Sequence, residues 1–464
     1  MTGKDLLSKI DSEEAKKNFQ ALYGEDTIEE ANKRYRALIE GFSAFAEKPA
    51  RGERGPSKET PIREFPETAL PPRLFSAPGR TELGGNHTDH NRGKVLAASI
   101  QLDAAAAAAP RQDGLVIFRS LGYPDAVVNL LKSDGSEDLG VKEAEKGSTE
   151  ALIRGIAAEF AGQGTAVRGF TANASNTVFA GSGLSSSAAV EVLIAKIFDC
   201  LYGGGRRPPV ELAKIGQKAE NNYFGKPSGL EDQIACAFGG AVALDFKDAA
   251  NPLVTPIKFD LASLGYALCV VNTGGSHADL TDDYASIPNE MRAVAACFGK
   301  TELRDCYRSD VLEKAQEIRK KLGDRAILRS LHFFSENSRV DDMRSALERT
   351  NTLLDDSYER QGALGRYLNL VTESGNSSWE LLQNIYSPKN PSEQGIALAL
   401  ALSRNFLANR GSARVHGGGF AGVIQAYVPL QALSSYKKEM EKVFGPNVVT
   451  TLMIRQIGAT EVLF

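Results

Sequence analysis

The 464-residue sequence predicts a protein of mixed helices and strands with more than one globular domain. Segments with apolar residues at helical spacing alternate with short apolar runs that glycine-rich turns separate. Hydrophobic residues make up 42% and charged residues 24%, enough to build globular cores. A proline-rich stretch ends near residue 72, and the pattern of elements begins afresh at residue 251. We therefore predict a helical extension with a linker over 1–72, and domains over 73–250 and 251–464.

Composition excludes several classes of protein. The net charge of −4 argues against a nucleic-acid binder that works through bulk charge. The five cysteines are scattered and none forms C-x-x-C, which indicates neither a zinc site nor a disulfide framework. No window approaches 18 uninterrupted apolar residues, and the polar start lacks an apolar signal core. We expect a cytoplasmic protein that neither spans a membrane nor binds nucleic acid.

Residues 4–48 predict two helices, followed by an extended linker. Residues 31–46 repeat apolar positions at helical spacing, so this face is expected to pack on the body of the protein. Its members are Tyr35, Leu38, Ile39, Phe42 and Phe45. Residues 49–72 hold six prolines and many charges, a composition typical of an extended linker or surface wrap.

Residues 75–96 are a poor core segment and a good site segment. They carry Arg80, Asn86, His87, Asp89 and other polar groups, with four glycines between or beside them. A solvated loop needs turn residues, but it does not need such a density of donors and acceptors. Six alanines follow at 104–109 and favour a helix by propensity, yet apolar runs at 95–100 and 115–118 flank them. We predict a β-hairpin whose small residues let a helix pack closely.

A glycine- and serine-rich loop over 180–187 precedes a predicted helix over 188–201. Glycines allow the backbone to approach a ligand closely, and the free N–H groups of a helix N-terminus suit a phosphate. No Gly-Lys-Ser/Thr follows, so this is not a Walker loop, and Ser186 replaces the third glycine of the dinucleotide fingerprint. A turn that simply caps the helix is the alternative.

Two further stretches complete the candidate site. A helix over 210–222 ends in a Gly/Pro/Gly loop, and Asp232 then falls in the first turn of an apolar helix. A favourable contact with the helix dipole is the simple explanation of that carboxylate. After strands near 241–246 and 266–272, helices are predicted over 287–298, 311–322 and 341–355. Residues 417–419 form a triple-glycine turn between two strands, a pattern that favours a fixed turn against a ligand.

Three separated motifs together resemble the signatures of galactokinases, a branch of the GHMP family of small-molecule kinases. They are Pro-Gly-Arg with Gly-x-His-Thr-Asp at 78–89, Gly-Leu-Ser-Ser-Ser-Ala-Ala at 183–189, and Gly-Gly-Gly-Phe-x-Gly at 417–422. The resemblance implies an α+β fold of two domains with the active site in the cleft between them. It implies transfer of a phosphoryl group from ATP, with Mg²⁺, to the anomeric C1 hydroxyl of a galactose-type sugar. We expect a monomer or a weak homo-oligomer.

The resemblance also implies residue roles. Asp232 matches the catalytic base near the C1 hydroxyl, and Arg80 matches the arginine paired with it. A cation beside Asp232 would lower its pKa and keep it ionised. Ser187 and Glu220, twelve residues before Asp232, match the Mg²⁺ contacts. The triphosphate contacts would be Gly181, Ser182, Gly183, Leu184, Ser185, Ser186 and Ser187, and the sugar contacts Asn86, His87, Asp89, Gly229 and Tyr284.

One departure from the family pattern bears on the substrate. The family glutamate that touches the C6 hydroxyl is replaced by Asn86, and the family tyrosine by His90. A carboxylate would repel a carboxylated C6, whereas an amide both donates and accepts. Galactose is the expected substrate, and galacturonate is the alternative. A non-catalytic sugar and ATP sensor on the same fold is the rival from another class, although Ser187, Glu220 and Asp232 favour an enzyme.

Overall fold

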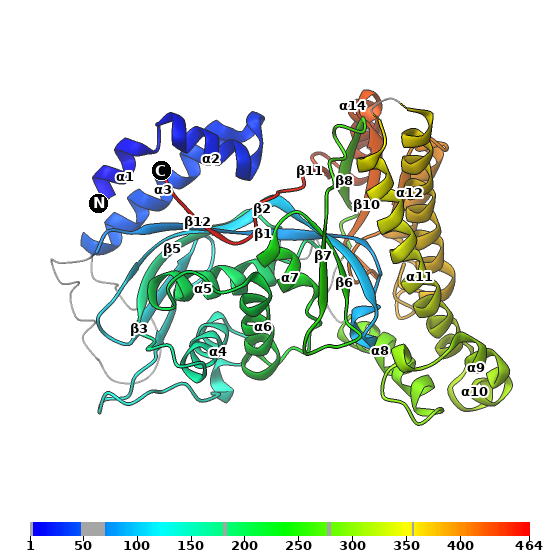
Figure 1. The fold of residues 1–464 in the computed structure, drawn as a ribbon, viewed down its shortest axis with the longest axis horizontal. Helices are drawn as coiled ribbons and strands as arrows, with labels where there is room; N and C mark the ends of the chain where they lie inside the picture. Colours follow the sequence, from blue (N-terminus) through cyan, green and yellow to red (C-terminus); the bar gives the residue numbers. More distant parts are fainter. Residues whose placement is uncertain (1–2, 48–69, 180–182, 276–279, 355–356) are drawn as a thin grey trace.

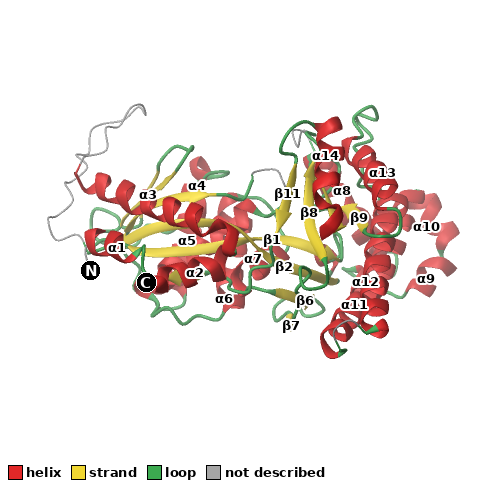
Figure 2. Ribbon diagram, turned by 90° about the horizontal axis from the view of Figure 1, so that it is seen from above, coloured by secondary structure: helices red, strands yellow, loops and turns green. Residues whose placement is uncertain are grey.

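The computed structural model describes residues 3–47, 70–179, 183–275, 280–354 and 357–464, and the side chains of residues 5–44 in the first range. It contains two β-sheets, and helices pack on both faces of each (Figures 1 and 2). The mixed helix-and-strand class is as predicted. In the described part of the chain, no helix is long and apolar enough to cross a membrane.

The larger sheet has eight strands, and most pairs of adjacent strands in it are antiparallel. Its main path runs β12-β1-β2-β5-β3-β4, and β6 and β7 extend it from β2. The bounds are β1 Arg73–Gly84, β2 Lys94–Pro110, β3 Leu115–Ser120, β4 Ala126–Asn129, β5 Phe170–Asn176, β6 Ala241–Asp245, β7 Leu253–Ile257 and β12 Thr460–Val462. β7 and β12 of this sheet come from the part of the chain after residue 250, which also supplies the second sheet. The domain boundary at residue 250 stays a prediction.

The predicted hairpin of residues 95–118 is wrong. β2 pairs with β1 on one side and β5 on the other, and β3 pairs in parallel with β5. β5 therefore lies between the two strands that sequence proximity suggested as partners. The alanines of β2 are packed closely on both faces of the strand. Ala104, Ala106 and Ala108 belong to one hydrophobic core, and Ala105, Ala107 and Ala109 belong to another. Small side chains suit a strand that is covered on both sides.

Helices cover the two faces of the large sheet. Figure 1 shows α1–α3 on one side of it and α4–α7 on the other. The N-terminal helices are α1 Gly3–Lys9, α2 Glu13–Tyr23 and α3 Ile28–Glu47, so residues 3–47 hold three α-helices where two were predicted over 4–48. As predicted, Tyr35, Leu38, Ile39 and Phe42 are buried against the body of the protein. The opposite face carries α4 Thr149–Gly162, α5 Ser186–Tyr202, α6 Pro209–Ala219 and α7 Glu231–Phe238.

The second sheet has four antiparallel strands in the order β11-β8-β10-β9. They are β8 Tyr266–Asn272, β9 Ser412–Val415, β10 Val423–Pro429 and β11 Val449–Leu452. Along β8, Leu268 and Val270 face one core, while Cys269 and Val271 face the other. Successive side chains of β8 point to opposite faces of the sheet, and helices cover both faces. The sequence of β8 is therefore apolar at consecutive positions.

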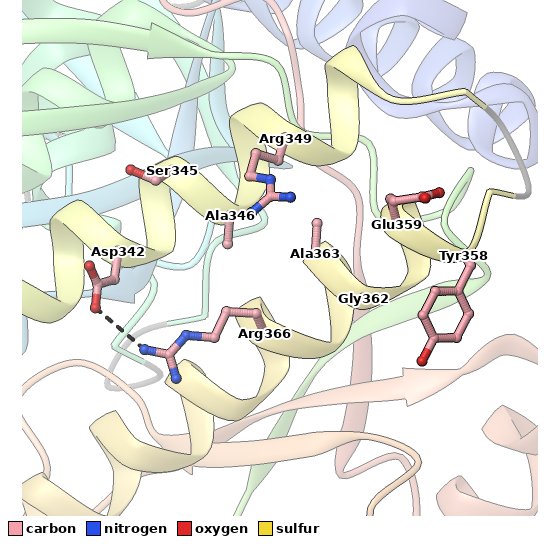
Figure 3. Close-up of a pocket in the computed structure, with 9 residues that line it drawn as sticks. All are labelled: Asp342, Ser345, Ala346, Arg349, Tyr358, Glu359, Gly362, Ala363 and Arg366. Atoms are coloured by element: carbon pink, nitrogen blue, oxygen red, sulfur yellow. Dashed lines mark hydrogen bonds and ion pairs between the residues drawn. The ribbon is translucent and has the colours of Figure 1, made fainter.

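The remaining helices are α8 Thr281–Ala296, α9 Arg308–Glu313, α10 Ala315–Leu322, α11 Asp324–Thr352, α12 Tyr358–Ser377, α13 Gly395–Leu407 and α14 Leu433–Phe444. Of these, α12, α13 and α14 contact the second sheet, α11 packs on α12, and α8, α9 and α10 pack on α11 (Figure 2). The helix predicted over 341–355 is the end of the 29-residue α11. A hollow of about 390 Å³ lies between α11 and α12, lined by Asp342, Ser345, Ala346, Arg349, Tyr358, Glu359, Gly362, Ala363 and Arg366 (Figure 3). It includes none of the predicted site residues.

Candidate active site

Asp232 and Arg80 form a tight ion pair at the start of α7. Arg80 lies in β1, next to a β-bulge, and is 6% exposed. Its Nε is 2.8 Å and its Nη2 2.6 Å from Asp232 Oδ1. The Asp232 side chain keeps 37% of its surface exposed. The carboxylate is thus held by a buried cation and still open on one side.

The glycine- and serine-rich loop contacts this pair directly. Ser185 Oγ donates a hydrogen bond of 2.7 Å to Asp232 Oδ2, and Ser185 itself has a positive φ of 62°. Arg80 donates to the carbonyl of Gly183 through Nη1, and its backbone N–H donates to the carbonyl of Leu184. Gly79 permits this approach, because a Cβ there would lie 2.7 Å from the Leu184 carbonyl oxygen. Predicted positions Gly181 and Ser182 lie outside the described residues.

The electrostatic environment holds Asp232 ionised. Burial acts to raise the pKa of Asp232, but Arg80, the Ser185 hydrogen bond and Lys226 outweigh burial and hold the pKa below its ordinary value. The neighbouring Glu231 is different. Burial is the largest influence on it and raises its pKa well above the usual range, even though Arg80 opposes this. Two adjacent carboxyl groups therefore have opposite protonation preferences, a pattern found where proton chemistry is organised.

Four of the five predicted sugar contacts gather at the triple-glycine turn and the loop before α7. His87 Nε2 donates a hydrogen bond of 2.9 Å to the carbonyl of Gly418, and Tyr284 Oη donates one of 3.1 Å to the carbonyl of Gly419. Burial lowers the pKa of His87 to about 3, so its imidazole is neutral. A Cβ on Gly229 would lie 1.9 Å from Asp89 Oδ2, so the carboxylate rests against that backbone.

The fifth, Asn86, is fully buried and held within the protein. Its Nδ2 donates a hydrogen bond of 2.7 Å to the Gly417 carbonyl and hydrogen bonds of 3.2 Å to each carboxylate oxygen of Glu82. Its Oδ1 accepts a hydrogen bond of 2.8 Å from Asn384 Nδ2 and one of 3.4 Å from Ser378 Oγ. Glu82 in turn pairs with the buried Arg414. The Asn86 amide thus has protein partners for both of its ends.

The predicted metal contacts differ in exposure. Ser187 is exposed in the first turn of α5, whereas Glu220 is 3% exposed, just after α6. Glu220 Oε1 is 3.1 Å from Lys226 Nζ, and Oε2 accepts 3.0 Å from Gln233 Nε2. Gln233 Nε2 also donates a hydrogen bond of 2.9 Å to Glu191 Oε2. The other carboxylate oxygen of Glu191, Oε1, has no hydrogen-bond partner in the described part of the protein.

The sequence is similar to known sugar kinases along most of its length. A model of the "GHMP kinases N terminal domain" matches residues 151–240, and the "Galactokinase galactose-binding signature" matches 63–110. A galactokinase of Streptomyces coelicolor is 32% identical over 382 residues, covering 81% of this chain and 90% of the relative. The chain belongs to the galactokinase family. A second galactokinase, from Glaesserella parasuis, is 30% identical over 78% of this chain and 86% of its own length.

Solved structures show the same fold. The galactokinase of Lactococcus lactis complexed with galactose superposes with a TM-score of 0.68 at 24% identity, over 84% of this chain and 95% of that one. A mevalonate kinase superposes with a TM-score of 0.55 at 16% identity, over 82% and 98%. As a galactokinase-family member, the protein is a sugar kinase, a phosphotransferase that takes ATP as substrate. The matched segments include Arg80, Glu220 and Asp232.

Ser187 and Glu220 are the two residues predicted to supply oxygen ligands to a Mg²⁺ ion shared with a nucleotide. Among the described residues, no group of three or more histidine, cysteine or acidic side chains could hold a metal. Mg²⁺ in kinases is typically held by one or two side-chain oxygens together with substrate phosphates, so a full protein cage is not required. The Glu220 carboxylate is paired with the ammonium of Lys226 at 3.1 Å, so a metal ion bound here would share this carboxylate with Lys226 or displace it.

Sequence reasoning missed several residues of this site. Glu191 lies one helical turn after Ser187 on α5, and a carboxylate within the otherwise apolar run 188–195 was a signal that could have found it. The contact of Ser185 with Asp232 had no such signal, since 47 residues separate the two. The same holds for His416, which lies just before the triple-glycine turn and contacts Thr81 across 335 residues.

Proposed function

We propose that this protein transfers the γ-phosphoryl group of ATP to the C1 hydroxyl of galactose. The observation that carries the proposal is the Asp232 carboxylate, which Arg80 holds from one side and Ser185 of the glycine-serine loop from the other. The loop side offers helix N–H groups for phosphates, and His87, Asp89 and Gly229 supply polar groups for a sugar. Asp232 would then lie between donor and acceptor.

The proposed chemistry depends on alignment and charge. Asp232 orients the C1 hydroxyl and accepts its proton as the sugar oxygen attacks the γ-phosphorus and the bond to ADP breaks. Arg80 lies close enough to stabilise negative charge that develops on the transferred group. Ser187 and Glu220 would hold Mg²⁺, which neutralises phosphate charge when bound. Gln233 and Lys226 keep the Glu220 carboxylate in place.

The contacts of Asn86 favour galactose over galacturonate. The case for galacturonate rested on an amide free to meet C6, and the Asn86 amide is instead bound to Glu82, Gly417 and Asn384. The Asn86 amide therefore has no free donor for a sugar carboxylate at C6, and two relatives that match most of this chain are galactokinases. The proposal of a non-catalytic sensor is disfavoured because Asp232 keeps both of its partners and an ionised state.

The test is ADP release with MgATP across galactose, galacturonate, glucose, galactosamine and arabinose. We expect turnover on galactose. Asp232→Asn should lower kcat by about 10²–10⁴-fold, because the proton acceptor is lost, while the Kd for ATP measured by calorimetry changes little. Preference for galacturonate would overturn the substrate assignment. Absent turnover on all five sugars, with ATP still bound, would establish the sensor. Full activity of Asp232→Asn would contradict the role of the carboxylate.

A further inference from the structure

His416 is a buried histidine at the junction of the first and third motifs. It follows β9 directly, precedes the triple-glycine turn and is 2% exposed. Its Nε2 lies 2.9 Å from Thr81 Oγ1 and 3.3 Å from the backbone N of Glu82. Both neighbours belong to β1, the strand that also carries Arg80.

These contacts define the tautomer of the ring. A backbone N–H can only donate, so Nε2 must accept from Glu82 and cannot carry a proton. Thr81 Oγ1 accepts 2.7 Å from Gln425 Nε2, which leaves its own proton to donate to His416. A neutral imidazole with a bare Nε2 carries its proton on Nδ1. Burial, together with the positive charges of Arg80 and Arg414, lowers the pKa of His416 well below its usual range, which agrees with a neutral ring.

The Nδ1–H donor is buried and, among the described residues, has no hydrogen-bond partner. Nδ1 lies next to Gly183, since a Cβ on that glycine would be 3.2 Å from Nδ1. Gly183 has a φ of 67° and presents its carbonyl to Arg80. An unpaired buried donor is costly, and few such groups persist in folded proteins without a partner or a functional reason. This donor adjoins the loop proposed to hold phosphates.

We infer that His416 Nδ1–H donates a hydrogen bond to a phosphate oxygen of ATP bound at Gly183. The inference rests on the proposed function, in which this loop holds the triphosphate. A phosphate oxygen is the acceptor that the surroundings favour, because Arg80 lies beside the same glycine and the proposed sugar contacts lie elsewhere, at His87, Asp89 and Gly229. His416 would add a neutral, directional donor to a site whose cation is Arg80.

Two variants separate the two sides of the ring. His416→Gln retains an acceptor near the Nε2 position for Thr81 and Glu82 but removes the donor at Nδ1. His416→Asn retains a donor near Nδ1 and loses the Nε2 contacts. We expect His416→Gln to raise the Kd for ATP about tenfold, about 1.4 kcal/mol, with little change in the Kd for adenosine or galactose. His416→Asn should lower the melting temperature and keep the wild-type ratio of ATP to adenosine affinity.

Nitrogen-15 NMR of the wild-type imidazoles gives a direct reading, since the chain has five histidines. We expect the His416 signal, assigned from its loss in His416→Gln, to show the Nδ1–H tautomer from pH 6 to 8 and to shift on adding ATP but not galactose. A proton on Nε2, an unshifted ring in protein shown by calorimetry to hold ATP, or equal losses of ATP and adenosine affinity in His416→Gln would overturn the inference. A wild-type protein that binds no ATP would instead refute the proposed function, and this inference with it.

Discussion

At the scale of single residues, Asn86 is the position where structure changes the interpretation most. Its amide donates to Glu82 and to the Gly417 carbonyl. Asn86→Glu would bring a second buried carboxylate against Glu82 and remove the donor to Gly417. We expect the free energy of unfolding to fall by about 3 kcal/mol, as for other unpaired buried charges, and the KM for galactose to rise. Urea unfolding followed by circular dichroism, with sugar kinetics, measures both.

The matched control moves the carboxylate across the contact. Glu82→Gln combined with Asn86→Glu restores one amide and one carboxylate, so the double variant should recover part of the stability that Asn86→Glu alone loses. Unchanged stability of Asn86→Glu, together with a new discrimination against galacturonate, would show that residue 86 faces C6 of the sugar after all.

At the scale of elements, one buried ion cluster attaches the N-terminal helices to the large sheet. Arg34 of α3 contacts Asp103 of β2 at 2.5 Å, and also donates 2.7 Å to Ser175 Oγ of β5. Asp103 is fully buried, and its other partners include Tyr23 and Arg455. Arg34→Ala should cost about 1.5–3 kcal/mol, because Asp103 loses a charge-assisted hydrogen bond but keeps Arg455, and should speed amide hydrogen exchange in α3.

The same helix supplies the control for this prediction. Arg36 pairs with Asp11 at 2.9 Å on the surface, so Arg36→Ala should cost less than about 1 kcal/mol. Equal exchange rates in the two variants would mean that apolar packing alone, through residues such as Tyr35 and Ile39, holds α3 on the sheet.

At the scale of the whole molecule, buried neutral histidines make stability depend on pH. Burial lowers the pKa of His87 to about 3 and also lowers those of His332 and His416. In the unfolded chain each would titrate near 6.5. Below that value the unfolded state binds more protons, so this contribution to stability is present above pH 6.5 and is lost as the pH falls toward the folded pKa.

The contribution of one histidine can be isolated. Because His87→Gln does not titrate, the wild type should lose about 1.4 kcal/mol per pH unit relative to this variant between pH 6 and 4.5. Urea unfolding at several pH values gives the difference, and any constant offset, such as the cost of glutamine at the positive φ of 61°, does not affect the slope. Parallel curves would show that His87 titrates normally in the folded protein.

Local patterns alone predicted much of this protein. Helical spacing identified the apolar face of α3, and glycine-serine composition ahead of a good helix-forming run identified the loop at α5. The helical face and the loop depend on residue type and short-range spacing, which the sequence states directly. The resemblance to galactokinases, and not a local pattern, implied the pair of Arg80 and Asp232, which is in contact, and the four sugar contacts that lie at one turn and one loop.

The tertiary structure decided what depends on contacts between distant parts of the chain. The insertion of β5 between β2 and β3, the protein partners of Asn86, the bond from Ser185 to Asp232 and the contact of His416 with Thr81 all join residues dozens to hundreds of positions apart. Local periodicity carries no record of which distant group will satisfy a buried donor or acceptor. Strand order and hydrogen-bond pairing are settled by packing of the whole chain, which buries these polar groups and so requires each to find a partner.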